Sequence, residues 1–440
     1  TSKTERVEAL TQYRVIGGLR PAMVLRTSGD ALEVLTTDRQ TVSMGYQGWR
    51  WTSRSPSQIL HPGDVIYLWS DSKHKLRLAQ LPRVQGALVS LNPSDGSVLA
   101  LIGGFDFGQS NFNRATQALR QPGSNIKPFI YSAALENGFT AASLVSGAPI
   151  VIEDSISGDW RPQNYSRKVF GPTRLREALS KSLNLVSVRL VRALGVEAVR
   201  DYLEKFGFDR ARLPQGLSLA LGSATVTPME IARAYGVFAN GGYLVEPFFI
   251  ARVEDPSGRI VEYANRQMLC SGCGIPISES SDSSQPSPDL RFSQQVVSPQ
   301  NAFILDSMMR EVIRSGTGRA AGSLQRDDLA GKTGTTNNYF DAWFTGYSSN
   351  IVATVWVGFD QPKDLGQGES GARAALPIWV DFMKTALSGK AHALQRPPGN
   401  IIRVRVNRRS GLPTDTDDPD GYSEYFVAGT EPTTPHAEFQ

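Results

Sequence analysis

The stretch RQPGSNIKPF, residues 120–129, is the part of the sequence that decides the fold. Its Pro-Gly pair predicts a turn, and an apolar helical pattern begins directly after it, so we place Ser124 at the N-terminus of a helix. Pro128 agrees with this placement, because proline is tolerated in a first turn, where backbone amides lack intrahelical partners. Lys127 then lies one turn after Ser124, on the same face of the helix.

A helix start would give this serine and lysine a joint chemistry. The positive end of the helix dipole stabilises negative charge that develops near Ser124. A lysine amine that is partly desolvated, or close to another cation, loses its proton readily enough to serve as a base. Ser124 and Lys127 could therefore carry acyl transfer without histidine, and the chain has no Gly-x-Ser-x-Gly elbow. The alternative is a helix cap followed by a solvated lysine.

The spacing alone does not identify a nucleophile, because Ser-x-x-Lys occurs three times in the chain. Ser70/Lys73 and Ser72/Lys75 overlap in SDSKHK, a polar segment that we interpret as a turn between strands. No helix is predicted there, so nothing would bring the hydroxyl and the amine together.

A second motif, Ser-Leu-Asn at 182–184, lies in a largely helical region downstream of the first. Ser-x-Asn occurs again at 90–92, where a strand ends, and at 348–350, in a polar hairpin turn. A helix-boundary cap is the alternative interpretation of the copy at 182–184.

Lys332-Thr333-Gly334-Thr335 is the third motif and contains the only Lys-[Ser/Thr]-Gly in the chain. At a strand edge, Lys332 would supply a fixed charge for a carboxylate, and Thr333 and Thr335 could hydrogen-bond it. Gly334 would let a bound acyl chain approach the backbone closely, and the edge amides could add the substrate as an extra strand. The alternative is a strand that ends in an ordinary turn.

Strands at both ends of the chain, with helices between them, predict an α+β fold whose sheet is built from distant segments. Residues 13–80 alternate short apolar runs with turn signals and predict a small all-β unit. A hairpin follows, in which GALVSL and SVLALIGG flank NPSDG, and after residue 329 AGKTGTT and IVATVWVGF are β-type runs that could pair antiparallel. Helices are expected to end at Asn137-Gly138 and to begin at Leu175, at the capping box TPME of 227–230 and at Ser298.

The composition is that of a globular protein, with 440 residues, 40% hydrophobic and 20% charged, which suggests roughly two to three domains. The net charge of +4 is small, and the basic runs at 73–77 and 403–409 are short and separate, which argues against nucleic-acid binding. No apolar run approaches the roughly 18 residues that span a bilayer, and we expect no signal peptide within these residues. Because the chain begins with Thr1, we expect a fragment from which a membrane anchor is missing.

The two cysteines, Cys270 and Cys273, form one Cys-x-x-Cys. A structural zinc site needs four ligands, and the four histidines are scattered without a second pair at metal spacing. A local disulfide or two free thiols are therefore favoured over a metal site. The Ser/Pro-rich segment 278–288 is expected to be a mobile loop.

The three motifs in this order resemble those of the penicillin-recognising serine acyltransferases, with separations of 58 residues (182 minus 124) and 150 residues (332 minus 182). The blocks RATQALRQPGSNIKPF, ALGSATVTPMEIARAYGVFANGGY and GKTGTTNNYFDAWFTGY resemble, more narrowly, the transpeptidase region of class A, bifunctional high-molecular-weight penicillin-binding proteins. This resemblance implies a penicillin-binding/β-lactamase-like transpeptidase fold, in which helices flank an antiparallel sheet. The all-β unit is similar to the OB-like domain inserted in some Gram-negative members. The expected domains are a linker remnant at 1–12, the OB-like domain at 13–82, the transpeptidase at 83–435 and a tail at 436–440.

By this resemblance, Ser124 attacks the carbonyl between the two D-alanines of a peptidoglycan stem peptide, and Lys127 takes the hydroxyl proton. Ser182, hydrogen-bonded between Lys127 and Lys332, relays a proton to the leaving D-alanine, while Asn184 holds the amide of the donor. An amine from a neighbouring stem peptide then attacks the acyl-enzyme and forms the cross-link. β-Lactams mimic the donor and remain attached as esters.

The same resemblance places the oxyanion hole at the backbone amides of Ser124 and Thr335 and the substrate at Thr333, Gly334 and Thr335. It implies no cofactor and no metal. The expected partners are stem peptides that end in D-Ala-D-Ala, β-lactam antibiotics and periplasmic regulators, with no nucleic acid. The expected location is the periplasmic face of the bacterial inner membrane, where the missing N-terminal helix would anchor a full-length protein that also carries a glycosyltransferase.

Three alternatives share these motifs. A β-lactamase would need a group that activates water for deacylation, and the sequence shows no clear equivalent. A DD-carboxypeptidase would release D-alanine and pass the acyl group to water without cross-linking. A non-catalytic β-lactam sensor would be acylated but inert towards stem peptides, and the class A sequence blocks argue against it.

Overall fold

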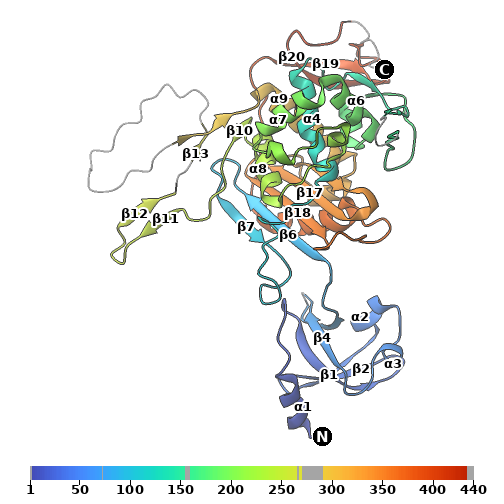
Figure 1. Ribbon diagram of the computed structural model, residues 1–440, viewed down its shortest axis with the longest axis vertical. Coiled ribbons are helices and arrows are strands. Elements are labelled where there is room, and N and C mark those ends of the chain that lie inside the picture. The colour runs from blue at the N-terminus through green and yellow to red at the C-terminus, as the bar shows by residue number, and fades with distance from the viewer. Residues whose placement is uncertain (1, 72, 154–158, 265–266, 270–290, 434–440) are drawn as a thin grey trace. The chain divides into compact units, whose positions relative to one another are not determined.

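The computed structural model describes residues 2–71, 73–153, 159–264, 267–269 and 291–433 (Figure 1). The chain divides into two compact units, one containing residues 1–85 and 104–112 and the other containing residues 86–103 and 113–440. The predictions for Cys270, Cys273, the segment 278–288 and the tail at 436–440 lie outside the described residues. Within the described ranges, no helix combines the length and the apolar character needed to cross a membrane.

The first unit is a sheet of five antiparallel strands in the order β3-β2-β1-β4-β5. Its strands are β1 (Arg20–Thr27), β2 (Leu32–Thr36), β3 (Thr41–Met44), β4 (Val65–Ser70) and β5 (Leu76–Ala79). Alternate side chains of β1, β2 and β4 form one apolar core, as the period of a half-buried strand requires. The all-β prediction is confirmed, although α2 (Tyr46–Trp49) and α3 (Pro56–Ile59) add short helical turns. Helix α1 (Lys3–Leu10), which begins with a capping box, lies in the segment predicted as a linker remnant.

The second unit contains a five-stranded sheet in the order β16-β17-β18-β6-β7, built from distant parts of its sequence (Figure 1). Its strands are β6 (Gln85–Leu91), β7 (Val98–Ile102), β16 (Ala330–Thr335), β17 (Asp341–Ser348) and β18 (Ile351–Gly358). The predicted hairpin is confirmed, since β6 and β7 pair antiparallel. The predicted pairing of AGKTGTT with IVATVWVGF is wrong, because β17 lies between these two strands and pairs antiparallel with both.

Helices pack around this sheet: α4 (Lys127–Glu136), α5 (Leu175–Ser180), α6 (Asn184–Leu194), α7 (Val196–Glu204), α8 (Pro228–Ala239), α9 (Pro299–Arg314) and α10 (Leu376–Ala386). On one face of the sheet, the larger core joins α4, α6, α8 and α9 to Trp343 and Trp356. On the other face, α10 packs against Phe344 and Val355. Because both faces are covered, β18 is an almost unbroken buried run rather than an alternating one. The predicted helix boundaries at Asn137, Leu175, Thr227 and Ser298 are confirmed.

Short two-stranded ribbons lie outside the main sheet of the second unit. They pair β8 (Leu144–Ser146) with β9 (Pro172–Arg174), β10 (Tyr243–Leu244) with β15 (Gln294–Gln295), β11 (Arg252–Glu254) with β12 (Ile260–Tyr263), β13 (Gln267–Met268) with β14 (Arg291–Phe292), and β19 (Ile401–Asn407) with β20 (Gly421–Val427). None of the predicted site residues lies on these ribbons.

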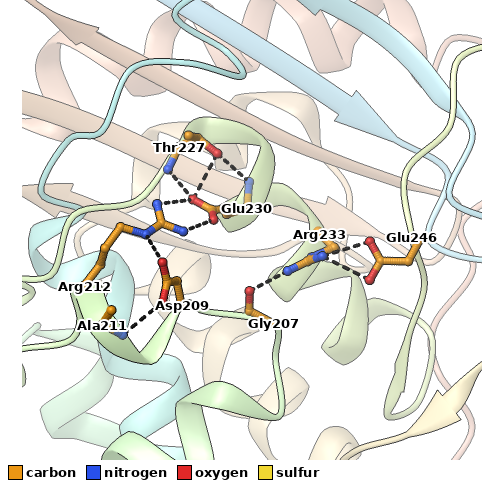
Figure 2. Close-up of polar contacts among 8 residues, drawn as sticks. All are labelled: Gly207, Asp209, Ala211, Arg212, Thr227, Glu230, Arg233 and Glu246. Atoms are coloured by element: carbon orange, nitrogen blue, oxygen red, sulfur yellow. Dashed lines mark hydrogen bonds and ion pairs between the residues drawn. The ribbon is translucent and has the colours of Figure 1, made fainter.

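Helix α8 is held in place by polar contacts around its N-terminus (Figure 2). Thr227 caps the helix by accepting from the amide of Glu230, and the Glu230 carboxylate accepts from the amide of Thr227 at 2.7 Å. Arg212 forms ion pairs with Glu230 and with Asp209. These contacts matter for the site because α8 carries Tyr235, which contacts the turn that contains Ser124.

Candidate active site

The segment at 120–129 places Ser124 and Lys127 one helical turn apart. Gly123–Ile126 form a 3₁₀ turn that leads directly into α4, and the carbonyl of Ser124 accepts from the amide of Lys127. Ser124 is half-buried, whereas the side chain of Lys127 is fully buried. The serine therefore lies at the start of a helical segment, with the lysine amine beneath the surface.

The chain just before the 3₁₀ turn is fastened to the sheet by buried polar contacts. Arg120 forms an ion pair with Asp341 of β17, with 2.7 Å between Nε and Oδ1. Nε1 of Trp356 donates to the same carboxylate at 2.8 Å, and Nε1 of Trp343 donates to the carbonyl of Gln121 at 2.8 Å. Rotation of the turn would break these contacts, so its position on the sheet is well defined.

Gly334 and Gly123 allow β16 and the 3₁₀ turn to lie in direct backbone contact. A Cβ at Gly334 would lie 2.4 Å from the carbonyl oxygen of Pro122. A Cβ at Gly123 would lie 2.6 Å from the carbonyl oxygen of Thr335, and Gly123 has a φ of +54°, which favours glycine. The close approach of a bound acyl chain at Gly334 stays a prediction, and the structure adds another reason for this glycine. Its missing side chain admits the protein's own turn and brings Thr335 next to the residue before Ser124.

The side chains of Lys127, Ser182, Asn184 and Lys332 form one hydrogen-bonded cluster. Nζ of Lys127 donates to Oδ1 of Asn184 at 2.7 Å and to the carbonyl oxygen of Ser182 at 2.8 Å. Nζ of Lys332 donates to Oγ of Ser182 at 2.8 Å, and the same Oγ lies 3.5 Å from Nζ of Lys127. The Ser182 hydroxyl therefore lies between two lysine amines.

Burial changes the protonation of both lysines, whose side chains are completely enclosed. It lowers the pKa of Lys127 well below its usual value, and the charge of Lys332 lowers the pKa of Lys127 further. Burial also lowers the pKa of Lys332 to about 7. At neutral pH the cluster can therefore hold an unprotonated amine, which is the form that a general base requires.

The Ser182 loop connects α5 to α6 in a strained conformation. Ser182 has a φ of +58°, and a residue with a side chain held in this left-handed region costs on the order of 1–3 kcal/mol. The amide of Leu183 donates to the carbonyl of Ala178 at 2.9 Å, and α6 begins at Asn184. This conformation turns the carbonyl and hydroxyl of Ser182 and the side chain of Asn184 towards Lys127.

The remaining predicted residues lie on β16, at the end of the sheet. Among the described residues, one edge of β16 has no partner strand, because it comes first in the order β16-β17-β18-β6-β7. Oγ1 of Thr333 shares a 2.7 Å hydrogen bond with Oγ1 of Thr317, and Oγ1 of Thr335 accepts from the amide of Gly371 at 3.0 Å. An extended peptide could pair with the free edge of β16.

The structure also brings residues to the site that the sequence patterns did not indicate. Oδ1 of Asn164 accepts from the amide of Asn184 at 2.9 Å. The hydroxyl of Tyr235 donates to the carbonyl of Asn125, the residue after Ser124, at 2.8 Å. Helical periodicity indicated the helix that carries Tyr235 but not its contact, and no local signal marked Asn164.

Two tyrosines link the loop that contains Asn164 to the turn that follows β16. Tyr165 follows Asn164, and Tyr339 lies in the turn after β16; their ring centroids are 6.0 Å apart and their hydroxyls 3.0 Å apart. Tyr165 is 62% exposed, so only partial desolvation, together with the hydrogen bond to Tyr339, raises its pKa. The pair therefore connects the loop next to Asn184 with the loop that follows Thr335.

Family comparisons cover both units of the chain. A family model described as the penicillin binding protein transpeptidase domain matches residues 86–384. A second, described as the penicillin-binding protein OB-like domain, matches residues 1–84. All of the predicted site residues lie within the first of these ranges.

The chain is also similar to individual proteins of known sequence or structure. It is 43% identical to penicillin-binding protein 1A of Pseudomonas aeruginosa over 95% of this chain and 55% of the relative. It is 38% identical to penicillin-binding protein 1A of Escherichia coli over 98% of this chain and 58% of the relative, so it spans somewhat more than half of each. The crystal structure of penicillin-binding protein 1A from Haemophilus influenzae matches with a TM-score of 0.90 and 35% identity, covering 99% of this chain and 67% of that chain. The structure of Mycobacterium tuberculosis PonA1 in complex with penicillin V matches with a TM-score of 0.58 and 26% identity, covering 73% of this chain and 82% of that chain.

Proposed function

Because the chain belongs to the family of penicillin-binding protein transpeptidase domains, we propose that its second unit is a serine D,D-transpeptidase acting on stem peptides that end in D-Ala-D-Ala. The observation that carries this proposal is the Ser182 hydroxyl between the amines of Lys127 and Lys332, next to a helical turn that begins with Ser124. A serine, an unprotonated lysine and a hydroxyl relay are the groups that acyl transfer between amines needs.

In the proposed acylation, Oγ of Ser124 attacks the carbonyl carbon of the penultimate D-alanine while Lys127 accepts the hydroxyl proton. Burial supports this role, because a lowered pKa leaves the Lys127 amine able to accept a proton at neutral pH. The carbon–nitrogen bond then breaks, and the terminal D-alanine leaves as an amine with a proton passed from Lys127 through Ser182. Asn184, which holds the amine of Lys127 at 2.7 Å, would also orient the amide of the donor.

The negative charge on the attacked carbonyl oxygen would be stabilised by the backbone amides of Ser124 and Thr335. The close backbone contact between Gly123 and Thr335 supports this assignment, because it brings the two segments together at the start of a helical turn. Loss of one such donor typically costs about 10²–10³ in rate. Lys332 and Thr333 of the same strand would bind the carboxylate of the donor.

In the second half of the reaction, an amine of a neighbouring stem peptide would attack the acyl-enzyme. Its nitrogen bonds to the carbonyl carbon, its proton passes to Lys127, the ester bond to Ser124 breaks, and the proton returns to the serine oxygen. The products are a cross-linked peptide and free enzyme. A β-lactam would acylate Ser124 in the same way as its ring opens, and would remain as an ester.

The setting of this reaction is part of the same proposal. The proposed location is the periplasmic face of the bacterial inner membrane, where stem peptides and β-lactams are encountered. This chain spans somewhat more than half the length of its relatives. For the whole protein we also propose an N-terminal anchor, a glycosyltransferase and periplasmic regulators.

A labelling experiment tests the nucleophile and the reaction class. The chain and its Ser124→Ala variant are incubated with a fluorescent penicillin, and we expect an adduct in the unsubstituted chain only, located on Ser124 by mass spectrometry. Ser70→Ala, which removes the serine of another Ser-x-x-Lys, should still be labelled. Covalent uptake by Ser124→Ala would refute the assignment.

The alternative reactions are separated by their products. A transpeptidase should give one stoichiometric burst with nitrocefin, whereas sustained turnover would indicate a β-lactamase. Lipid-linked substrate should yield cross-linked peptide; release of D-alanine without cross-links would indicate a DD-carboxypeptidase, and no reaction at all with stem peptides would indicate a sensor.

A further inference from the structure

Asn164 lies outside the three motifs but makes contacts next to the lysine cluster. It is buried, with 4% of its surface exposed. Its Oδ1 accepts from the amides of Asn184 at 2.9 Å and of Leu185 at 3.3 Å, which are the first two residues of α6. The residue in the N-cap position of α6 is Leu183, whose side chain makes no capping hydrogen bond. Asn164 therefore caps α6 from another part of the chain.

The segment that contains Asn164 also fixes the side chain of Asn184. The carbonyl of Gln163 accepts from Nδ2 of Asn184 at 2.8 Å, which leaves Oδ1 of the same amide turned towards Nζ of Lys127 at 2.7 Å. Nδ2 of Asn164 donates to the carbonyl of Lys168 at 3.0 Å. The orientation of both asparagine amides is therefore defined by hydrogen bonds.

This cap matters because the loop that it holds is strained. Ser182 has a left-handed φ of +58°, and the chain must begin α6 two residues later. Without the acceptor from Asn164, the first amides of α6 would lose their partner, and a buried amide without a partner is unfavourable. The loop could then relax to a conformation in which Ser182 no longer lies between the two lysine amines.

We propose that Asn164 is a positioning residue for acyl transfer. It holds the Ser182 loop so that Ser182 and Asn184 stay within hydrogen-bonding distance of Lys127 and Lys332. It acts through these residues, and its effect is on the acylation step rather than on folding alone. This inference rests on the proposed function, because its consequence is measured as a rate of acylation.

The test compares Asn164→Leu, Asn164→Ala and Asn164→Asp in the full chain, with acylation by a fluorescent penicillin followed by stopped flow. Leucine keeps the volume without an acceptor, whereas aspartate keeps an acceptor and places its charge at a helix N-terminus, where it is favourable. We expect the Leu and Ala variants to lower the acylation rate constant about 10- to 100-fold, as is typical for residues that orient a reacting group. We expect the Asp variant to restore most of that loss.

Ser2→Ala is the matched control, because it removes the N-cap of α1, which lies in the first unit. It should lower the melting temperature and leave the acylation rate constant unchanged. A folded Asn164→Leu chain with the unsubstituted rate, or an Asp variant no faster than the Leu variant, would overturn the positioning role. If the Leu and Ala variants do not fold, the Asp variant decides: a rate near that of the unsubstituted chain supports the role, and a loss as large as that expected for Leu overturns it.

The two proposals fail in different ways. Labelling of the Ser124→Ala variant would contradict the proposed function itself. Correct labelling of Ser124 together with an unaffected rate in Asn164→Leu would overturn only the role of Asn164.

Discussion

Two segments of this chain carry the same Ser-x-x-Lys pattern in opposite surroundings. Ser70 ends β4 and is exposed, as is Lys73, and the turn that joins them is held by Asp71, whose Oδ1 accepts from the amide of Lys73 at 2.9 Å. Ser124, by contrast, is half-buried and Lys127 is completely buried. The spacing is the same, so the difference in chemistry comes from burial and from the neighbouring groups.

The comparison indicates which surroundings would let the lysine of this pattern act as a base. An amine surrounded by water keeps its proton at neutral pH, whereas removal of water disfavours the charged form. Burial lowers the pKa of Lys127 in this way, and Lys332, on the other side of the Ser182 hydroxyl, lowers the same pKa further. A lysine three residues after a serine is therefore a candidate base only where the fold encloses it beside a second cation.

The largest effect is expected when the lysine is removed from each segment in turn. Lys127→Met should lower the rate of acylation by a fluorescent penicillin about 10²–10⁴-fold, the usual contribution of a general base. Lys73→Met should leave that rate unchanged, because this side chain is exposed and lies in the first unit. Acylation of a natively folded Lys127→Met chain at the unsubstituted rate, with folding checked by circular dichroism, would show that another group accepts the serine proton. The burial that distinguishes Lys127 from Lys73 would then not explain the reaction.

Local signals explain the parts of the fold that could be predicted from the sequence. The capping box at Thr227 and the cap at Ser298 are short patterns whose hydrogen bonds form within a single turn, and both helices begin where these patterns place them. Strand β17 was missed because its existence depends on distant segments. Its eight residues are all buried, between helices on both faces, so they show no alternation that would mark a strand.

The candidate site likewise contains residues that the sequence indicated and residues that it did not. Residues 124, 127, 182, 184 and 332 could be named because their motifs occur in a characteristic order. Asn164 and Tyr235 could not. Asn164 accepts from amides 20 and 21 positions away and Tyr235 donates to a carbonyl 110 positions away, and these bonds have no sequence pattern. For Gly334 the structure adds a reason that the sequence did not indicate, since the carbonyl of Pro122 lies where its side chain would be.

A second substitution, Lys332→Met, tests how strongly one lysine sets the protonation of the other. In the proposed mechanism Lys127 is a base in its neutral form, so acylation should rise as the pH increases through the pKa of Lys127. Loss of the charge at Lys332 removes one of the two causes that lower this pKa, so the rising limb should move to higher pH. The maximal rate should also fall, though less than in Lys127→Met, because the 2.8 Å contact with Ser182 is lost.

The measurement is the acylation rate constant between about pH 5 and 10, the range that brackets a lysine whose pKa is lowered from its usual value. Lys363→Met is the control, because this lysine is exposed. A rising limb that stays in place in Lys332→Met would mean that the two amines titrate independently, and that burial alone separates Lys127 from an exposed lysine.

The smallest of these effects concerns how the two serine turns are held. The exposed turn is held by the side chain of Asp71, whereas the turn at Ser124 lies against β16 at Gly334. Gly334→Ala would place a Cβ 2.4 Å from the carbonyl oxygen of Pro122. We expect the free energy of unfolding to fall by about 1–3 kcal/mol, as is typical of overpacking, with slower acylation because the turn must shift.

Gly236→Ala is the matched control, because a Cβ at this position in α8 would meet nothing within 4 Å. Alanine favours a helix over glycine by about 0.8–1.0 kcal/mol, so this variant should be at least as stable as the unsubstituted chain in urea unfolding. If Gly334→Ala were equally stable and equally fast in acylation, the Ser124 turn could move away from β16 without cost. The oxyanion hole assigned to Ser124 and Thr335 would then lose its structural support, and only the burial of Lys127 would distinguish the two turns.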